Sequence, residues 1–144
     1  MPDDAAKETV EQLIVLTEQI TRRISQDADA FEARRTHEVA GRIEETVRLA
    51  NLYRRETARV RSDPGVVLGA PRPTRERLAR ASEAFETALK RHGRALYAVK
   101  TVTEGIVRAI AEEVVRARAV GAAYGPGARG PMADATAVTL NRMA

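Results

Sequence analysis

Residues 74–119, TRERLARASEAFETALKRHGRALYAVKTVTEGIVRAIAEEVVRARA, form the stretch that decides the fold. Mostly apolar side chains recur there in steps of three and four: Leu78, Ala81, Phe85, Leu89, His92, Leu96, Val99, Val102, Ile106, Ile110 and Val114. The positions between them are mostly charged, so a helix would carry one apolar and one polar face. This spacing predicts one long amphipathic helix that packs against other helices, as in a coiled coil. Thr74 is its expected start and Gly121 its expected end.

Two further helices are predicted upstream, over residues 3–34 and 36–62. The apolar positions of the first include Val10, Leu13, Ile20, Ile24 and Phe31, and those of the second include Val39, Ile43, Val47, Tyr53 and Val60. We expect the chain to reverse at Arg34–Thr36, although neither glycine nor proline marks the turn. Residues 63–73 hold three prolines and two glycines, which predicts a loop in which Val66–Leu68 fold back over the apolar core.

Composition points to the same fold class. Aromatic residues make up 3% of the 144 residues, tryptophan is absent and 31% of residues are charged. A narrow helical core can be closed by Leu, Ile, Val and Ala, whereas a broad core normally uses aromatic side chains. The sequence therefore predicts an all-α protein, an elongated antiparallel helical hairpin packed on one long C-terminal helix, in a single domain over residues 1–119. Residues 120–144 are rich in Gly, Pro and Ala and are expected to form a flexible tail.

Several protein classes are disfavoured by what the chain lacks. It has no cysteine, which excludes disulfides and thiolate metal sites. No apolar run approaches the roughly 20 residues that span a bilayer. The first residues, Met1–Asp4, are acidic and do not resemble a secretory signal. We therefore expect a cytoplasmic protein that does not contact membranes.

The net charge of +4 raises the question of nucleic-acid binding. The densest basic group is Arg54, Arg55, Arg59 and Arg61, near the end of the second predicted helix, where cations also suit the helix dipole. Acidic residues are interleaved with the basic ones along every predicted helix. A solvated charged face explains this pattern better than a phosphate-binding patch does.

No catalytic or metal-binding motif is present. The two histidines are His37, at the expected reversal, and His92, in phase with the apolar face of the long helix. The chain has no Glu-x-x-His pair, no His-Glu-x-x-His, no phosphate-binding loop and no Gly-x-Ser-x-Gly. His92 lacks the second group that acid–base chemistry needs. We expect a protein that is not an enzyme and has neither a cofactor nor a metal site.

The predicted helix lengths do not match. At 1.5 Å per residue the first two helices are each roughly 40–45 Å long, whereas the third is roughly 70 Å. Residues from about 103 to 119 should therefore extend past the helices that cover the rest. Leaving their aliphatic side chains in water is costly, at about 1.5–3 kcal/mol per side chain. These side chains are Ile106, Val107, Ile110, Val114 and Val115. We expect a partner helix, a second copy of the chain or the tail to cover them. Gly105 lies where this part begins and is either a hinge or simply a tolerated small residue.

Certain short segments of the sequence resemble those of a known protein family. They include Glu11-Gln12-Leu13-Ile14, Leu49-Ala50-Asn51-Leu52-Tyr53 and Val102-Thr103-Glu104-Gly105-Ile106-Val107. Over roughly residues 8–117 the chain resembles the FlgN-type flagellar export chaperones of alphaproteobacteria. The resemblance implies a cytoplasmic helical protein that holds secreted flagellar hook-associated proteins before type III export, with export-apparatus components as further partners. It places contact with the partner's terminal amphipathic helix on Val99, Val102, Ile106, Ile110 and Val114.

Three functions are therefore compared below. A chaperone should expose this apolar row when alone and bury it against a partner helix. A self-associating coiled coil should close the same row in a homodimer. A nucleic-acid binder, the least favoured, should show salt-sensitive affinity that depends on Arg54, Arg55, Arg59 and Arg61.

Overall fold

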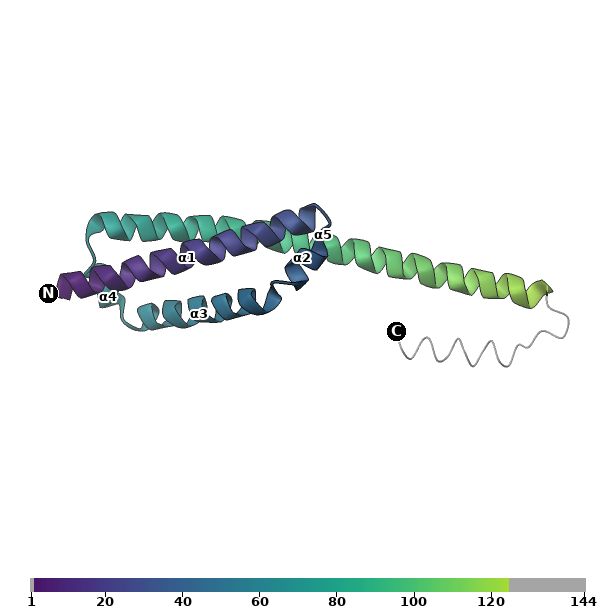
Figure 1. The fold of residues 1–144 in the computed structure, drawn as a ribbon, viewed down its shortest axis with the longest axis horizontal. Coiled ribbons are helices and arrows are strands. Elements are labelled where there is room, and N and C mark those ends of the chain that lie inside the picture. The colour runs from purple at the N-terminus through teal and green to yellow at the C-terminus, as the bar shows by residue number, and fades with distance from the viewer. Residues whose placement is uncertain (1, 125–144) are drawn as a thin grey trace. The chain divides into compact units, whose positions relative to one another are not determined.

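The computed structural model describes residues 2–124, which fold into five helices (Figure 1). These are α1 (Pro2–Glu32), α2 (Thr36–Ala40), α3 (Ile43–Ser62), α4 (Pro64–Leu68) and α5 (Arg72–Tyr124). The predicted all-α class, with a helical hairpin packed on a long C-terminal helix, is confirmed. The chain divides into two compact units, residues 1–99 and residues 100–144.

Helix α1 forms the centre of the first unit, between α3 and the first part of α5 (Figure 1). It supplies most of the buried side chains: Val10, Leu13, Ile14, Leu16, Thr17, Ile20, Ile24, Ala28, Ala30 and Phe31. Helix α3 packs more loosely, and none of its residues is fully buried. Its main apolar contacts are Leu49, Ala50 and Tyr53, and the Tyr53 ring lies 4.8 Å from that of Phe85.

Helix α5 meets α1 through small side chains spaced seven residues apart. Ala81, Ala88 and Ala95 are buried, whereas Leu89 and Leu96, expected on the packed face, are 48% and 46% exposed. Alanine lets two helix backbones approach closely, and the larger leucines then lie at the edge of the contact. The steps of three and four were thus predicted correctly and Ala81 is buried as expected, but at the next two turns the buried residue is the alanine before the predicted leucine.

The reversal after α1 lies where the sequence predicts it, at residues 33–35. The N–H of Arg35 donates to the carbonyl of Ala30 at 2.7 Å, and that of Arg34 donates to Phe31 at 3.1 Å. These two bonds define a Schellman motif, whose left-handed position is normally glycine. Here Arg34 occupies it, with φ of 60°. The turn therefore forms without glycine, the residue from which it could have been predicted.

The second predicted helix, 36–62, is in fact two helices, broken at Gly41 and Arg42. The Arg42 guanidinium lies 2.8 Å from the carboxylate of Asp27, whose side chain is only 2% exposed. A buried carboxylate requires a partner, so this ion pair ties the break between α2 and α3 to the C-terminal part of α1. Glycine at position 41 lowers the cost of interrupting the helix.

Replacing Arg42 with methionine should lower the free energy of unfolding by about 2 kcal/mol, because the Asp27 carboxylate would stay buried without its partner. This loss of stability is smaller than that expected for a fully buried ion pair, because water reaches the Arg42 side chain. Urea unfolding followed by circular dichroism measures the change. The double variant Asp27→Leu with Arg42→Met should recover most of the loss. An unchanged stability in Arg42→Met would show that the ion pair contributes nothing.

Three ion pairs, made by two arginines of α5, join α1 to α5 at the surface. Arg77 lies 2.8 Å from Glu11, and Arg91 binds both Glu32 and Asp29. The hydrogen bond from Arg91 holds the pKa of the Glu32 carboxyl below its usual value. The folded state therefore gains stability from this pair above the unfolded pKa of Glu32, and loses it as the pH falls through the folded one.

Other boundaries also differ from those predicted. The predicted loop 63–73 contains the short helix α4, whose Val66 and Val67 pack against the cluster of Val10 and Ile14 as expected. Leu68, also expected to fold back over the core, is 69% exposed. Helix α5 begins at Arg72 and continues past Gly121 to Tyr124. It also runs unbroken through Gly93 and Gly105. The rest of the predicted tail, residues 125–144, lies outside the described residues.

Candidate partner-binding surface

The second unit presents the aliphatic row that the sequence predicts as a binding site. Every residue from 100 to 122 is exposed except Arg118, which is half-buried. The first row consists of Val102, Ile106, Ile110 and Val114, with 47%, 55%, 59% and 38% of their areas exposed. Steps of four residues keep these side chains on one winding row of the helix surface. The first row is therefore available to a partner.

Val99, the remaining predicted site residue, lies in the first unit. It is half-buried and packs against the cluster of Ala28, Ala30, Phe31, Val39 and Ala95. Its side chain thus helps to close the first unit. A contact between Val99 and a partner stays a prediction.

A second row of small and aliphatic residues was not assigned to the site from the sequence. It consists of Val107, Ala111, Val115 and Ala119, and the two valines are 61% and 67% exposed. Its members are also spaced by four. Val107, Ala111 and Val115 each follow a member of the first row by one position, and Ala119 lies four residues further along. The signal was visible in this spacing, but a search for one apolar face passes over it.

The second row lies on a nearly flat part of the helix surface. This part is lined by Ala111, Val115 and Ala119 with Arg108, Glu112 and Arg116. The alanine side chains are short, so a larger side chain from a partner could fill the space beside Val115. The lining offers aliphatic contact and charge, and its single carboxylate, Glu112, lies between the two guanidinium groups of Arg108 and Arg116 in the sequence.

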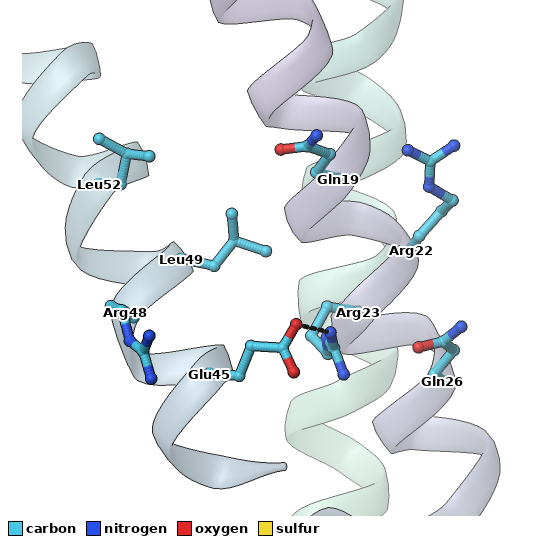
Figure 2. A pocket seen from close by; sticks show the side chains of 8 residues that line it. All are labelled: Gln19, Arg22, Arg23, Gln26, Glu45, Arg48, Leu49 and Leu52. Carbon is cyan, nitrogen blue, oxygen red and sulfur yellow. Dashed lines mark hydrogen bonds and ion pairs between the residues drawn. The ribbon is translucent and has the colours of Figure 1, made fainter.

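In the first unit, a groove runs between α1 and α3. In Figure 2, Leu49 and Leu52 extend from α3 towards α1, and the Arg23–Glu45 ion pair, 2.7 Å long, joins the two helices. This part of the groove has a volume of about 440 Å³. A further part of about 640 Å³ includes Leu13, Leu16 and Val60. The groove is lined mainly by Gln, Arg, Glu and Leu side chains, which pack against one another or are solvated. No two of them form a pair suited to acid–base catalysis.

The basic group Arg54, Arg55, Arg59 and Arg61 lies exposed on α3. Arg55 and Arg59 each lie within 4 Å of Glu56, at 3.9 and 3.7 Å. Part of the positive charge is thus offset within the helix, in keeping with a solvated face.

The histidines occupy ordinary structural positions. His92 makes an edge-on contact with the Phe31 ring, 5.6 Å between centroids, and His37 is exposed. Within residues 2–124, no cluster of three His, Asp or Glu side chains is arranged to hold a metal ion. In the same range, no helix combines the length and apolarity needed to cross a membrane.

Comparison with known proteins yields one informative relative. No protein-family model matches the chain, and no solved structure matches it. The flagellar basal-body protein FlbY of Caulobacter vibrioides (strain ATCC 19089 / CIP 103742 / CB 15) is 49% identical over 144 residues, covering 96% of this chain and 95% of the relative. Identity of this degree extends over almost the whole of both proteins. The chain therefore belongs to the family of the flagellar basal-body protein FlbY.

Proposed function

We propose that this protein is a flagellar export chaperone that binds an amphipathic terminal helix of a hook-associated protein before type III export. The observation that carries the proposal is the first row, Val102, Ile106, Ile110 and Val114, which lies exposed on a regular helix. Aliphatic residues at four-residue spacing are what a helix-in-groove or helix-on-helix contact requires. The proposed site consists of side chains that would pack against those of a partner helix, so the proposed activity is binding and not catalysis.

The first row offers enough apolar surface for a reversible complex. Complete burial of a valine or isoleucine side chain is worth about 1.5–3 kcal/mol. The four side chains are roughly half exposed, so covering them contributes about 3–6 kcal/mol before the cost of association. Contacts from neighbouring residues would add to this. A chaperone must release its client, and an interface of this strength permits release.

The flagellar part of the proposal is supported by two similarities of the same sequence. The relative FlbY is named as a flagellar basal-body protein, and we infer that this chain also serves the flagellum. The phrases of α1, α3 and α5 that resemble FlgN-type chaperones suggest the same organelle. They also suggest a cytoplasmic location and export-apparatus components as a second class of partner. The first row coincides with the contact that this resemblance implies.

Light scattering and calorimetry of the purified full chain test the proposal. The probe is a synthetic peptide with the sequence of the helical C-terminal segment of a hook-associated protein from the same organism. We expect a monomer that forms a one-to-one complex with the peptide. A stable homodimer that ignores the peptide would overturn the proposal in favour of a self-associating coiled coil.

A nucleic-acid function predicts a different result in the same assays. It requires binding to DNA or RNA that weakens steeply with salt, and that falls further when Arg54, Arg55, Arg59 and Arg61 are neutralised. The ion pairs to Glu56 argue against such a patch. We therefore keep one proposal, binding of a protein helix.

A further inference from the structure

The groove between α1 and α3 carries opposite charge at its two ends. Its two parts share Gln19 and Leu52, so they form one continuous groove along the two helices. The part nearer the start of α3 is lined by three cations and one anion, Arg22, Arg23, Arg48 and Glu45. The part nearer the start of α1 is lined by three anions and one cation, Glu8, Glu11, Glu56 and Arg59. We call them the basic part and the acidic part.

Ion pairs within the first unit leave this difference of charge in place. The pairs that involve these residues are Arg23 with Glu45, Glu11 with Arg77, and Glu56 with Arg55 and Arg59. Among residues 3–122, Arg22 and Arg48 of the basic part and Glu8 of the acidic part have no ion-pair partner. The unpaired charges are therefore positive at one end of the groove and negative at the other.

Aliphatic side chains line the groove between these charges. They come from both helices and are Leu13, Val15, Leu16, Leu49, Leu52 and Val60. Val15 and Leu52 are 49% and 37% exposed, and Figure 2 shows Leu49 and Leu52 extending from α3 towards α1. None of the residues of α3 is fully buried. The groove thus offers apolar surface that a further element could remove from water.

A helix is the element that fits this groove. Two packed helices leave a furrow between them, and a third, convex helix fills it with interdigitated side chains, as in helical bundles and helix-in-groove complexes. A second copy of this chain docked through the same face would set groove against groove. Such a contact would leave space unfilled, which close packing disfavours.

We propose that the groove between α1 and α3 binds one amphipathic helix of another protein, with acidic residues at one end and basic residues at the other. Along α1 the groove extends from Glu8 to Gln26, about 27 Å, which corresponds to a helix of about 18 residues. The acidic end would lie beside Arg48 and the basic end beside Glu8. The site lies in the first unit and does not include the first row, so the inference goes beyond the proposed function.

The helix dipole indicates the direction of the bound helix. Acidic residues stabilise the N-terminal turn of a helix and basic residues its C-terminal turn. A helix with its acidic end at the N-terminus would place that terminus at the basic part of the groove. The bound helix would then run antiparallel to α1.

Calorimetric titration with designed peptides tests the charge order. The full-length chain carries Ile106→Asp and Ile110→Asp, so that a peptide cannot bind at the first row. The probe has 18 residues, with leucine at every third and fourth position, glutamate in the rest of its N-terminal half and lysine in the rest of its C-terminal half. The control peptide has the same composition, with glutamate and lysine alternating. We expect the probe to bind one-to-one, and the control to bind at least about tenfold more weakly.

Three substitutions, each added to the same chain, locate the binding. Leu52→Asp puts a carboxylate among the aliphatic side chains and should weaken binding of the probe at least about tenfold. Arg48→Glu, at an exposed position outside the core, should weaken it at least about fivefold. Val47→Asp is the matched control, because Val47 is 51% exposed on α3 and does not line the groove. It should change the affinity less than about threefold.

The outcomes separate this inference from the proposed function. Equal affinity for the two peptides, or no binding of either, would overturn the inference. Equal effects of Leu52→Asp and Val47→Asp would do so too, as would a complex with two copies of this chain. In an otherwise unmodified chain, Leu52→Asp should leave binding of the hook-associated peptide unchanged. Loss of that binding would contradict the separation of the two sites. Failure of the unmodified chain to bind the hook-associated peptide, with the probe still bound, would overturn the proposed function alone.

Discussion

Ile14→Ala should lower the free energy of unfolding by about 3–4 kcal/mol. The Ile14 side chain has no exposed surface and lies in the cluster of Val10, Ala70 and Ala81, between α1, α4 and α5. Removing three carbon atoms there forfeits their burial and leaves a cavity that a helix-packed core fills only in part. Urea unfolding followed by circular dichroism gives the value, and the slope of the transition should not change.

The same substitution at Ile110 provides the matched control. Ile110 is 59% exposed, so Ile110→Ala should change the stability by less than about 0.5 kcal/mol. Alanine is also the better helix former, which offsets part of any loss. Equal destabilisation by the two substitutions would mean that Ile110 is a core residue, and the chaperone proposal would lose its site.

The heptad spacing allowed most of the fold to be predicted. Steps of three and four identify α1, α3 and α5 because helix packing depends on a repeating apolar face, which the sequence carries directly. The spacing does not determine which of two adjacent residues lies at the centre of the contact. Ala88 and Leu89 both fit the period, and the closer approach that alanine allows favours Ala88.

Two features could not be predicted from local sequence. The break at Gly41–Arg42 depends on an ion pair with Asp27, fifteen residues away, and on the burial of that carboxylate. In the sequence Asp27 interrupts the apolar pattern of α1, whereas in the structure it is the buried partner of Arg42. The Schellman turn likewise places Arg34 where glycine is usual, because the packing of both helices outweighs the local preference.

The candidate site was predicted in part. A search for one amphipathic face finds the first row, because Val102, Ile106, Ile110 and Val114 continue the pattern that begins at Leu78. The second row lies outside that face, and the structure shows that its Val107 and Val115 are as exposed as the first row.

Replacing Ile106 and Ile110 together by aspartate should weaken binding of the helical C-terminal peptide more than about 100-fold. Each isoleucine is more than half exposed, and covering it contributes on the order of 1–2 kcal/mol. A partner helix would in addition have to desolvate two carboxylates, which costs further free energy. The sum exceeds about 3 kcal/mol, which corresponds to more than two orders of magnitude in affinity. Calorimetric titration measures it.

A matched control comes from α3, where Ile43 and Val47 are also four residues apart and each 51% exposed. Ile43→Asp with Val47→Asp introduces the same charges on an equally exposed helical surface that the proposed function does not use. We expect this variant to bind the peptide as the unmodified chain does. The Ile106/Ile110 variant should in turn keep the unfolding midpoint of the first unit, because neither residue belongs to its core. Equal loss of binding in both variants would show that added negative charge, and not the first row, governs the interaction. Unfolding of the Ile106/Ile110 variant would show that these side chains support the fold. Selective loss of binding, with stability retained, is the result that only a docking surface on the first row produces.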